Sequence, residues 1–439
     1  MNDLQAGNDP KSKKMEEKPA KDTTVKISPL APKKFPNMYP VPGVEMGAMA
    51  SGVRYKNRLD LMMFVFAEGT QAAGVFTKSK APGAPVDWTK NALAQGQGQA
   101  RALVVNAGNA NAFTGAQGEK TTAAVADAVT GFYDCPADQI MQASTGVIGE
   151  PLSPHPLIKG LCKIKDGLSC ALWPDAARAI MTTDTFPKGS SRKTSIHGEE
   201  TVITGIAKGS GMIAPDMATM LGFVCTNAAL TADCLKAVLR SLTDQTFNAI
   251  TVDSDTSTSD MVLAFATGAR AGYGCISDPD DPALNAFKAD LQAVMKDLAQ
   301  QVVKDGEGAT KFVQIDIVGA EDDSAAKTIA LSVANSPLVK TALAGEDPNW
   351  GRLIMAAAKS GEAVNRDQMQ LWIGDQLVAK NGAVCRRYSE EKAAAHMKGQ
   401  NILLKIDVGV SGADTAGTAQ VWTCDMTHDY ISINADYRS

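Results

Sequence analysis

Short strand-like runs alternate with helical segments along most of this sequence, and the alternation restricts the fold class. In the run KFVQIDIV at 311–318, Val313, Ile315 and Ile317 recur at every second position, as in a half-buried strand. Residues 282–305 instead carry apolar side chains at spacings of three and four, the period of an amphipathic helix. Two such periods in one chain predict a mixed α/β fold.

The last third of the chain adds further strand-like segments. The runs QLWIG, ILLKIDV and AQVWTCD are separated by GDQ, KNGA and SGADTAG, which are rich in turn-forming residues. We therefore predict at least one predominantly antiparallel sheet. The run RALVVN at 101–106 predicts another strand earlier in the chain.

Composition and charge restrict the class of partner. The 439 residues are 44% hydrophobic, enough for two or more packed domains, and the formal net charge of -5 is unfavourable for binding nucleic acid. We find no apolar run near the roughly 18 residues of a membrane span, and no signal-peptide pattern. We therefore predict a soluble, cytoplasmic protein that binds neither nucleic acid nor membrane.

Cysteine and histidine usage argues against a metal centre. The eight cysteines form no CxxC pair, and the four histidines form no HExxH motif. Such spacing in a long chain is typical of reduced thiols. We predict no metal site.

The first 34 residues differ from the remainder in composition. They contain no aromatic residue and are rich in Lys, Glu, Pro and Asp, so they offer little apolar surface to bury. Their acidic residues and lack of arginine are unlike a transit peptide. We predict a disordered tail over 1–34.

Six loops share an unusual content of Gly, Thr, Ser and Asn. They are NAGNANAFTGAQG (106–118), STGVIG (144–149), MTTDTFPK (181–188), VDSDTSTSD (252–260), KDGEGATK (304–311) and EDPNWGR (346–352). Each alone is most simply a turn. Together they predict the walls of one polar pocket on a rigid sheet.

A nucleotide-binding interpretation of the glycine-rich loop has little support. Gly209, Gly211 and Ala214 match G-x-G-x-x-A, but Pro215 follows at once and the next run, MLGFVCT, predicts a buried strand. A dinucleotide loop must instead open a helix that faces the pyrophosphate. The sequence also lacks GxxxxGK[ST] and GxSxG motifs.

Five motifs together resemble one family. STGVIG, MTTDT, KGSGMIAPDMATML, DGEGATK and EDPNWGR are similar to those of the ornithine acetyltransferases of arginine biosynthesis, the bifunctional glutamate N-acetyltransferase type, and the resemblance spans 35–439. It implies a layered α/β sandwich with mixed and antiparallel sheets, as in N-terminal-nucleophile aminopeptidases.

The resemblance also implies self-cleavage. The precursor would cut between Ala218 and Thr219, giving an α chain whose folded part is 35–218 and a β chain of 219–439. The family pattern implies an assembly of two α and two β chains.

Thr219 is the nucleophile implied by this resemblance. A threonine hydroxyl reacts poorly without a base, and the free α-amino group left by cleavage, with a reference pKa of about 7.7 to 8.0, can take its proton. The alternative is a plain strand threonine, because β-branched residues suit strands.

Other roles follow from the same resemblance. Thr145 and Gly146 would form an oxyanion hole, Lys208 would pair with a substrate carboxylate, and Glu307 would bind the amino group of ornithine. The respective alternatives are a tight turn, a solvated lysine and a loop acid.

Three further positions are implied to contact substrate. Thr182 is favoured within MTTDT, with Thr183 and Thr185 as the alternatives because the family resemblance does not fix the spacing to Lys208. Asn434 and the terminal Ser439 match the end of the family sequence.

The implied reaction is a two-step acetyl transfer. N2-acetylornithine would acetylate Thr219 and release ornithine, and glutamate would then take the acetyl group. No cofactor is implied, and use of acetyl-CoA as a co-substrate stays open. The alternatives are a related N-terminal-nucleophile aminopeptidase or amidase, with water as acceptor, and a non-catalytic amino-acid-binding protein on the same scaffold.

Overall fold

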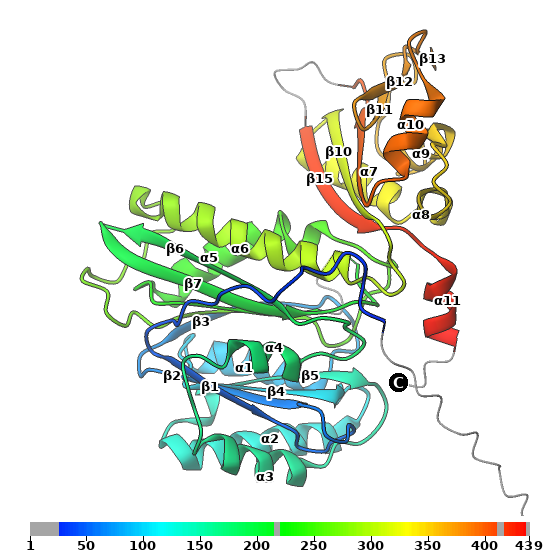
Figure 1. Ribbon diagram of the computed structural model, residues 1–439. Helices are drawn as coiled ribbons and strands as arrows, with labels where there is room; N and C mark the ends of the chain where they lie inside the picture. Colours follow the sequence, from blue (N-terminus) through cyan, green and yellow to red (C-terminus); the bar gives the residue numbers. More distant parts are fainter. Residues whose placement is uncertain (1–25, 215–219, 411–416, 436–439) are drawn as a thin grey trace, which may run out of the picture.

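In the part of the chain that the structure describes, three β-sheets have helices packed on them (Figure 1). The structure is a computed structural model that describes residues 26–214, 220–410 and 417–435. Two sheets stack within one body, and the third stands over one end of that body, at the upper right of Figure 1. The prediction of a mixed α/β fold with mixed and antiparallel sheets is confirmed.

The first sheet has four strands in the order β1-β2-β4-β5. Its strands are β1 (Val44–Met49), β2 (Leu61–Phe66), β4 (Ala102–Asn109) and β5 (Ile140–Val147). Only β4 and β5 are parallel neighbours. Helices α2 (Gly115–Tyr133) and α3 (Pro154–Ile164) cover its outer face (Figure 1). Strand β4 is the strand that RALVVN predicted, and it is buried throughout because both faces of the sheet are covered.

The second sheet has five strands in the order β3-β9-β8-β7-β6. They are β3 (Gln71–Phe76), β9 (Met261–Ala266), β8 (Leu221–Thr226), β7 (Glu199–Lys208) and β6 (Lys188–Ile196). Helices α5 (Ala232–Asp244) and α6 (Asn285–Lys304) cover its outer face (Figure 1). Helix α6, preceded by the short 3-10 turn η3 (Pro282–Leu284), confirms the helix predicted over 282–305.

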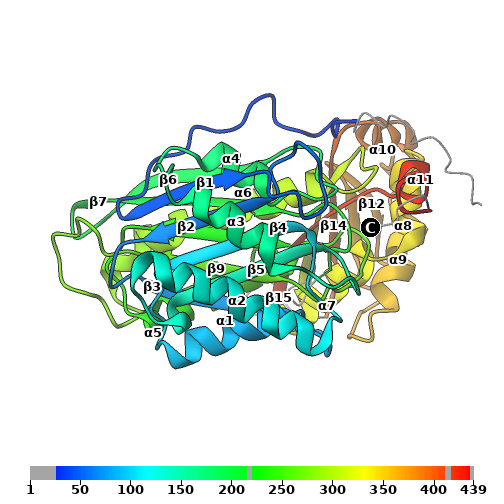
Figure 2. The same cartoon turned by 90° about the horizontal axis from the view of Figure 1, so that it is seen from below.

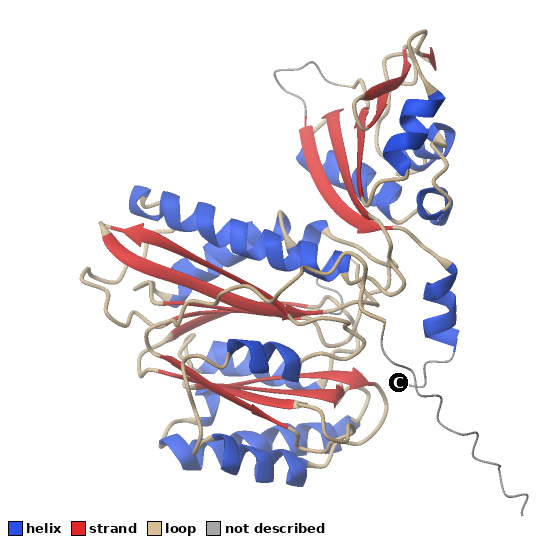
Figure 3. Cartoon of the chain, in the orientation of Figure 1, coloured by secondary structure: helices blue, strands red, loops and turns tan. Residues whose placement is uncertain are grey.

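Aromatic side chains and two helices fill the space between the stacked sheets. Helices α1 (Ala84–Gln95) and α4 (Trp173–Ala179) lie at opposite flanks (Figure 2). Between them Phe66 stacks on Phe265 with ring centroids 4.3 Å apart, which joins the sheets directly. The body is therefore a layered sandwich of helices, sheet, core, sheet and helices (Figure 3).

The third sheet has six strands in the order β13-β12-β11-β14-β10-β15. They are β10 (Phe312–Ala320), β11 (Gln370–Ile373), β12 (Gln376–Lys380), β13 (Ala383–Val384), β14 (Asn401–Asp407) and β15 (Gly417–Cys424). Its helices are α7 (Asp323–Ala334), α8 (Pro337–Ala344), α9 (Trp350–Ala358) and α10 (Glu390–Met397). Only β10 and β14 pair in parallel, which confirms the predicted predominantly antiparallel sheet.

A last helix, α11 (His428–Ala435), follows β15 and lies beside the body (Figure 1). Two other 3-10 turns are η1 (Ala137–Gln139) and η2 (Phe247–Ala249). Within the described ranges, no helix has the length and apolar character needed to cross a membrane.

The predicted cleavage point falls between two neighbouring strands of the second sheet. Ala218 and Thr219 lie outside the described residues, but β7 ends before them and β8 begins after them. Strands β8 and β9, from the predicted β chain, sit between β3 and β7 of the predicted α chain. A cut there would leave both chains joined by the hydrogen bonds of one sheet.

Residues 26–34, which were predicted to belong to a disordered tail, have a described structure. Ser28 donates its backbone N–H to Thr185 Oγ1 at 2.9 Å and its hydroxyl to the Lys304 carbonyl at 2.6 Å. The predicted boundary of the tail at residue 34 is therefore corrected for 26–34, whereas 1–25 lie outside the described residues. An average over composition cannot reveal two such hydrogen bonds.

Candidate active site

A polar pocket of about 350 Å³ gathers side chains from distant parts of the chain. Six of its lining residues are ones that the sequence resemblance selects: Thr145, Gly146, Thr182, Lys208, Glu307 and Asn434. They come from β5, the loop after α4, β7, the loop after α6, and α11. The structure thus brings together side chains separated by up to 289 positions in the sequence, from Thr145 to Asn434.

The remaining predicted positions, Ala218, Thr219 and Ser439, lie outside the described residues. Described residues on either side of the gap at 215–219 lie at or next to the pocket. Leu221, two positions after Thr219, pairs with the pocket residue Lys208 across β7 and β8. Gly211 on the other side of the gap also lines the pocket.

Thr145 and Gly146 lie where β5 pairs irregularly with β4. Asn109 of β4 pairs with both Thr145 and Val147, a bulge of the kind that redirects side chains near active sites. Gly146 has φ +128°, and a Cβ there would lie 2.4 Å from the Gly108 carbonyl carbon. Only glycine fits at this position. Thr145 and Gly146 both line the pocket, so a threonine and a glycine backbone contribute to its wall.

Lys208 ends β7 and is 3% exposed, so the alternative of a solvated surface lysine is wrong. Burial lowers the pKa of Lys208, while the nearby carboxylates of Asp184 and Asp260 oppose the shift. A desolvated ammonium that lines a pocket is well suited to attract a carboxylate ligand, because little water competes for it.

Glu307 supplies the opposite charge. Its Oε2 accepts a hydrogen bond from Asn434 Nδ2 at 2.8 Å, and its backbone N–H donates to the Ser210 carbonyl at 2.9 Å. Burial raises the pKa of Glu307, with hydrogen bonds from Asn434 and Thr183 acting against the shift. A Cβ on Gly211 would lie 2.5 Å from the Glu307 carboxyl group, so glycine gives the carboxylate room.

The threonines of MTTDT take different places. Thr182 and Thr183 both line the pocket, and Thr183 Oγ1 lies 2.6 Å from Ser210 Oγ. Thr185 instead donates its hydroxyl to Asp305, so the interpretation of Thr185 as a pocket residue is wrong. The choice between Thr182 and Thr183 as the substrate contact stays a prediction.

Sequence reasoning missed several hydroxyl groups. Ser257, Thr258 and Ser259 line the pocket, as does Ser210. The loop 252–260, which holds the first three of these residues, was predicted to form a wall of the pocket, but nothing in its composition singled out individual positions. A run of hydroxyl residues directly before a buried strand is the signal that could have found them.

One of the six predicted loops lies elsewhere. Among the residues that the structure describes, none from 346–352 lines the polar pocket. Asn349 caps α9 by accepting a hydrogen bond from the Arg352 N–H at 3.3 Å. The polar composition of this loop serves a helix start, so its assignment as a pocket wall is wrong.

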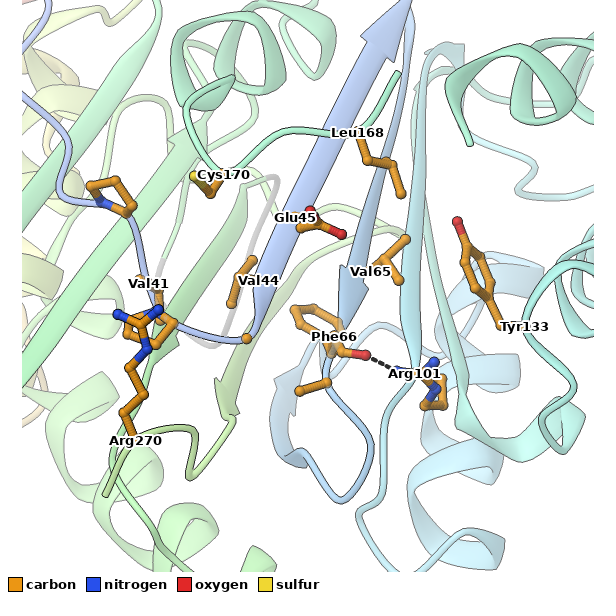
Figure 4. Close-up of a pocket in the computed structure, with 14 residues that line it drawn as sticks. Val41, Val44, Glu45, Val65, Phe66, Arg101, Tyr133, Leu168, Cys170 and Arg270 are labelled. Atoms are coloured by element: carbon orange, nitrogen blue, oxygen red, sulfur yellow. Dashed lines mark hydrogen bonds between the residues drawn. The ribbon is translucent and has the colours of Figure 1, made fainter. Parts of the chain in front are cut away.

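A second depression lies at one end of the first sheet, where β1 begins and β2 ends (Figure 4). It has a volume of about 660 Å³ and is lined by Val41, Val44 and Val65 among others. Arg101, which lines it, donates its guanidinium to the Phe66 carbonyl. We assign the chemistry to the smaller polar pocket, where opposite charges and hydroxyl groups converge.

Fold and pocket together define a small-molecule enzyme of layered α/β architecture, with a site that suits a ligand bearing both an amine and a carboxylate. The sequence profile of the ArgJ family matches residues 45–439. The arginine biosynthesis bifunctional protein ArgJ of Agrobacterium fabrum is 51% identical over 418 residues, which cover 95% of this chain and 100% of that protein. The chain belongs to the ArgJ family, which confirms the resemblance drawn from its motifs.

Solved structures are similar in part. A crystal structure of the bifunctional protein ArgJ of Bacillus halodurans is 39% identical and covers 50% of this chain and 100% of that chain, with a TM-score of 0.47. The ornithine acetyltransferase of Mycobacterium tuberculosis, crystallised with ornithine, is 32% identical and covers 40% of this chain and 92% of that chain, with a TM-score of 0.34.

Proposed function

We propose that this chain transfers an acetyl group from N2-acetylornithine to glutamate, giving ornithine and N-acetylglutamate. The observation that carries the proposal is one pocket that holds Lys208 and Glu307 together with Thr145 and Gly146. Lys208 suits the α-carboxylate common to both substrates, and Glu307 suits the side-chain ammonium of ornithine. Membership of the ArgJ family, whose relative in Agrobacterium fabrum is named for arginine biosynthesis, supports this assignment.

The first step forms a covalent intermediate. The Thr219 hydroxyl, after loss of its proton to the α-amino group, attacks the acetyl carbonyl carbon of acetylornithine. Thr145 Oγ1 and the Gly146 N–H stabilise the resulting oxyanion by hydrogen bonds. The C–N bond then breaks, ornithine nitrogen takes the proton, and an acetyl ester stays on Thr219.

The second step reverses these roles with a new acceptor. The amine of glutamate attacks the ester carbonyl, its proton passes to the α-amino group, and the C–O bond breaks to restore the Thr219 hydroxyl. This route needs no cofactor, since the amide donor and the ester intermediate supply the chemistry. We also propose acetyl-CoA as a second donor, because a thioester can acetylate the same hydroxyl and the relative in Agrobacterium fabrum is named bifunctional.

We further propose an assembly of two α and two β chains in the cytoplasm. The interleaved order β3-β9-β8-β7-β6 supports a tight α–β pair, since two of its four strand pairings, β3-β9 and β8-β7, would join the two chains after a cut. Chromatography with light scattering on processed protein would show twice the mass of one precursor.

Dependence on glutamate tests the reaction class. With acetylornithine alone, the proposed enzyme releases about one equivalent of ornithine and then stops, because the acetyl group stays on the protein. Added glutamate should restore continuous turnover. An amidase would release acetate continuously without glutamate, and a binding protein would release nothing, and either result would overturn the proposal.

Replacing Glu307 with glutamine tests the charge assignment. Because burial raises the pKa of Glu307, this carboxylate is neutralised at a higher pH than an exposed one, so its attraction for the ornithine ammonium fades as the pH falls. We expect Glu307→Gln to weaken ornithine binding by about tenfold or more, from a charge-assisted bond of about 1.5 to 3 kcal/mol. Calorimetry from pH 5 to 8 measures both effects.

Glutamate is the matched control ligand, because it has no side-chain amine. Its affinity should not fall in Glu307→Gln. Wild type and variant with the same pH dependence of ornithine binding would contradict the assignment.

A further inference from the structure

We propose that a buried ion cluster beneath the pocket, Asp184, Lys188 and Asp305, positions the residues that contact substrate, and that Asp184 carries this effect. We call these three residues the ion triad. The inference rests on the proposed function for the identity of the substrates. The ion triad itself lies behind the pocket wall, so its members are positioning residues.

The geometry of the ion triad is centred on Lys188, the first residue of β6. Its Nζ lies 2.6 Å from Asp184 Oδ1 and 2.6 Å from Asp305 Oδ2, and all three side chains are 0% exposed. Asp184 belongs to the loop after α4, and Asp305 directly follows α6. The ion triad therefore joins the neighbouring residues Asp184 and Lys188 to the end of α6, which lies 117 positions after Lys188.

Asp184 connects the ion triad to the pocket. Its Oδ1 also accepts the Gly209 N–H at 2.7 Å, and its Oδ2 accepts the Thr182 N–H at 2.9 Å. Thr182 lines the pocket, and Gly209 directly follows the pocket lysine Lys208. One carboxylate thus fixes the backbone on two walls of the site.

Neighbouring positive charges keep the Asp184 carboxyl group ionised, so both of its oxygens accept hydrogen bonds from these donors. Burial raises the pKa of its carboxyl group, but the Lys188 and Lys208 ammonium groups outweigh burial and hold the pKa at about 2. Asp184 is therefore ionised throughout the physiological range. Its charge also faces Lys208, which helps that lysine to stay protonated.

Asp305 connects the ion triad to Thr185 and not to the pocket. It accepts hydrogen bonds from the backbone N–H of Thr185 at 2.9 Å and from the Thr185 hydroxyl. Thr185 Oγ1 in turn accepts the Ser28 N–H. This branch fastens the N-terminal segment behind the site, whereas the Asp184 branch reaches the pocket wall.

Stability alone does not account for such a cluster. Burying charges costs desolvation energy that pairing barely recovers, and apolar replacements of similar volume are often as stable. Well-satisfied buried networks do fix geometry, because each donor has one low-energy arrangement. The position of Asp184, bonded to two pocket segments, gives that geometry a use.

The matched variants Asp184→Asn and Asp305→Asn test the proposal. Each removes one negative charge from Lys188 and keeps the side-chain shape. In Asp184→Asn the new amide N–H would turn toward Gly209, Thr182 or Lys188, all of which are donors. In Asp305→Asn the new amide can face the Thr185 hydroxyl, which accepts as readily as it donates.

We expect Asp184→Asn to lose about a hundredfold in kcat/KM for both substrates, the size of effect that a displacement near 1 Å produces. Asp305→Asn should lose less than about threefold, because a hydroxyl partner can adapt. Melting temperatures should fall in both variants. The proposal would be overturned if both variants lost kcat/KM equally and the losses followed the falls in melting temperature.

Ornithine affinity by calorimetry gives a readout that does not depend on turnover. It should fall in Asp184→Asn and be retained in Asp305→Asn. If the affinities follow this pattern but the wild-type protein transfers no acetyl group, the proposed function is refuted and the positioning role of Asp184 is kept. Should Asp184→Asn yield no folded protein, Asp184→Glu keeps the charge and shifts the acceptor, and wild-type ornithine affinity in that variant would refute the role.

Discussion

Thr219→Ala should leave a single chain of 46.1 kDa with no acetyl-transfer activity. The same hydroxyl is proposed to attack the preceding carbonyl during maturation and the acetyl carbonyl during turnover, so its loss removes both reactions. A denaturing gel measures cleavage, and release of ornithine from acetylornithine measures activity. N-terminal sequencing of the wild-type fragment 219–439 should give Thr-Met-Leu-Gly as its first residues.

Thr219→Ser is the matched variant for this prediction. Serine keeps the hydroxyl but lacks the methyl group that restricts χ1, so it should cleave and turn over more slowly than wild type. A Thr219→Ala protein with measurable transfer would end the assignment of the nucleophile. Full activity in a wild-type preparation that stays uncut would refute the need for cleavage.

Thr145→Ala should lower kcat by about 10² to 10³, the usual loss for one oxyanion-hole donor. The hydroxyl lies at the pocket wall beside Gly146, whose φ of +128° and contact with Gly108 admit only glycine. Removal of the hydroxyl leaves one donor for the oxyanion. The effect is measured as steady-state rates on fully cleaved protein. Cleaved protein is needed because the proposed self-cleavage also passes through an oxyanion, so uncut chains would lower the observed rate.

Thr145→Ser keeps the donor and serves as the control. It should retain kcat within about tenfold, because only the methyl group is lost. A cleaved Thr145→Ala enzyme with less than a twofold loss in kcat would return this segment to the role of a plain turn.

Periodicity predicted the elements of the fold well and their arrangement poorly. The strands at 101–106 and 311–318 and the helix over 282–305 all exist, because each has a local signal: a continuous apolar run at 101–106, alternation at 311–318 and helical spacing at 282–305. The order β3-β9-β8-β7-β6 joins segments nearly 200 positions apart. No local pattern specifies such pairing, because it depends on how whole layers pack.

The candidate site was predicted from motifs, and its supporting residues were missed. Thr145, Lys208 and Glu307 were selected by resemblance and do meet in one pocket. Lys188 ends the polar loop 181–188, but most lysines are exposed, and the sequence does not show that Asp305 Oδ2 lies 2.6 Å from Lys188 Nζ. Long-range ion pairs of this kind become visible only in three dimensions.

The error at 346–352 has a similar origin. Asn349 and its neighbours have the composition of a binding loop, but Asn is also among the preferred residues for capping a helix. Both functions use the same polar groups. Only the position of the loop relative to the pocket distinguishes them.

The intact mass of the fragment that begins at Thr219 tests the covalent route most directly. Wild-type enzyme mixed with acetylornithine alone and quenched in acid should show this fragment heavier by about 42 mass units, one acetyl group, with the modification on Thr219. Glutamate added before the quench should return the fragment to its original mass. Continuous acetyl transfer to glutamate with no acetylated fragment at any time would contradict the covalent route and indicate direct transfer between bound substrates.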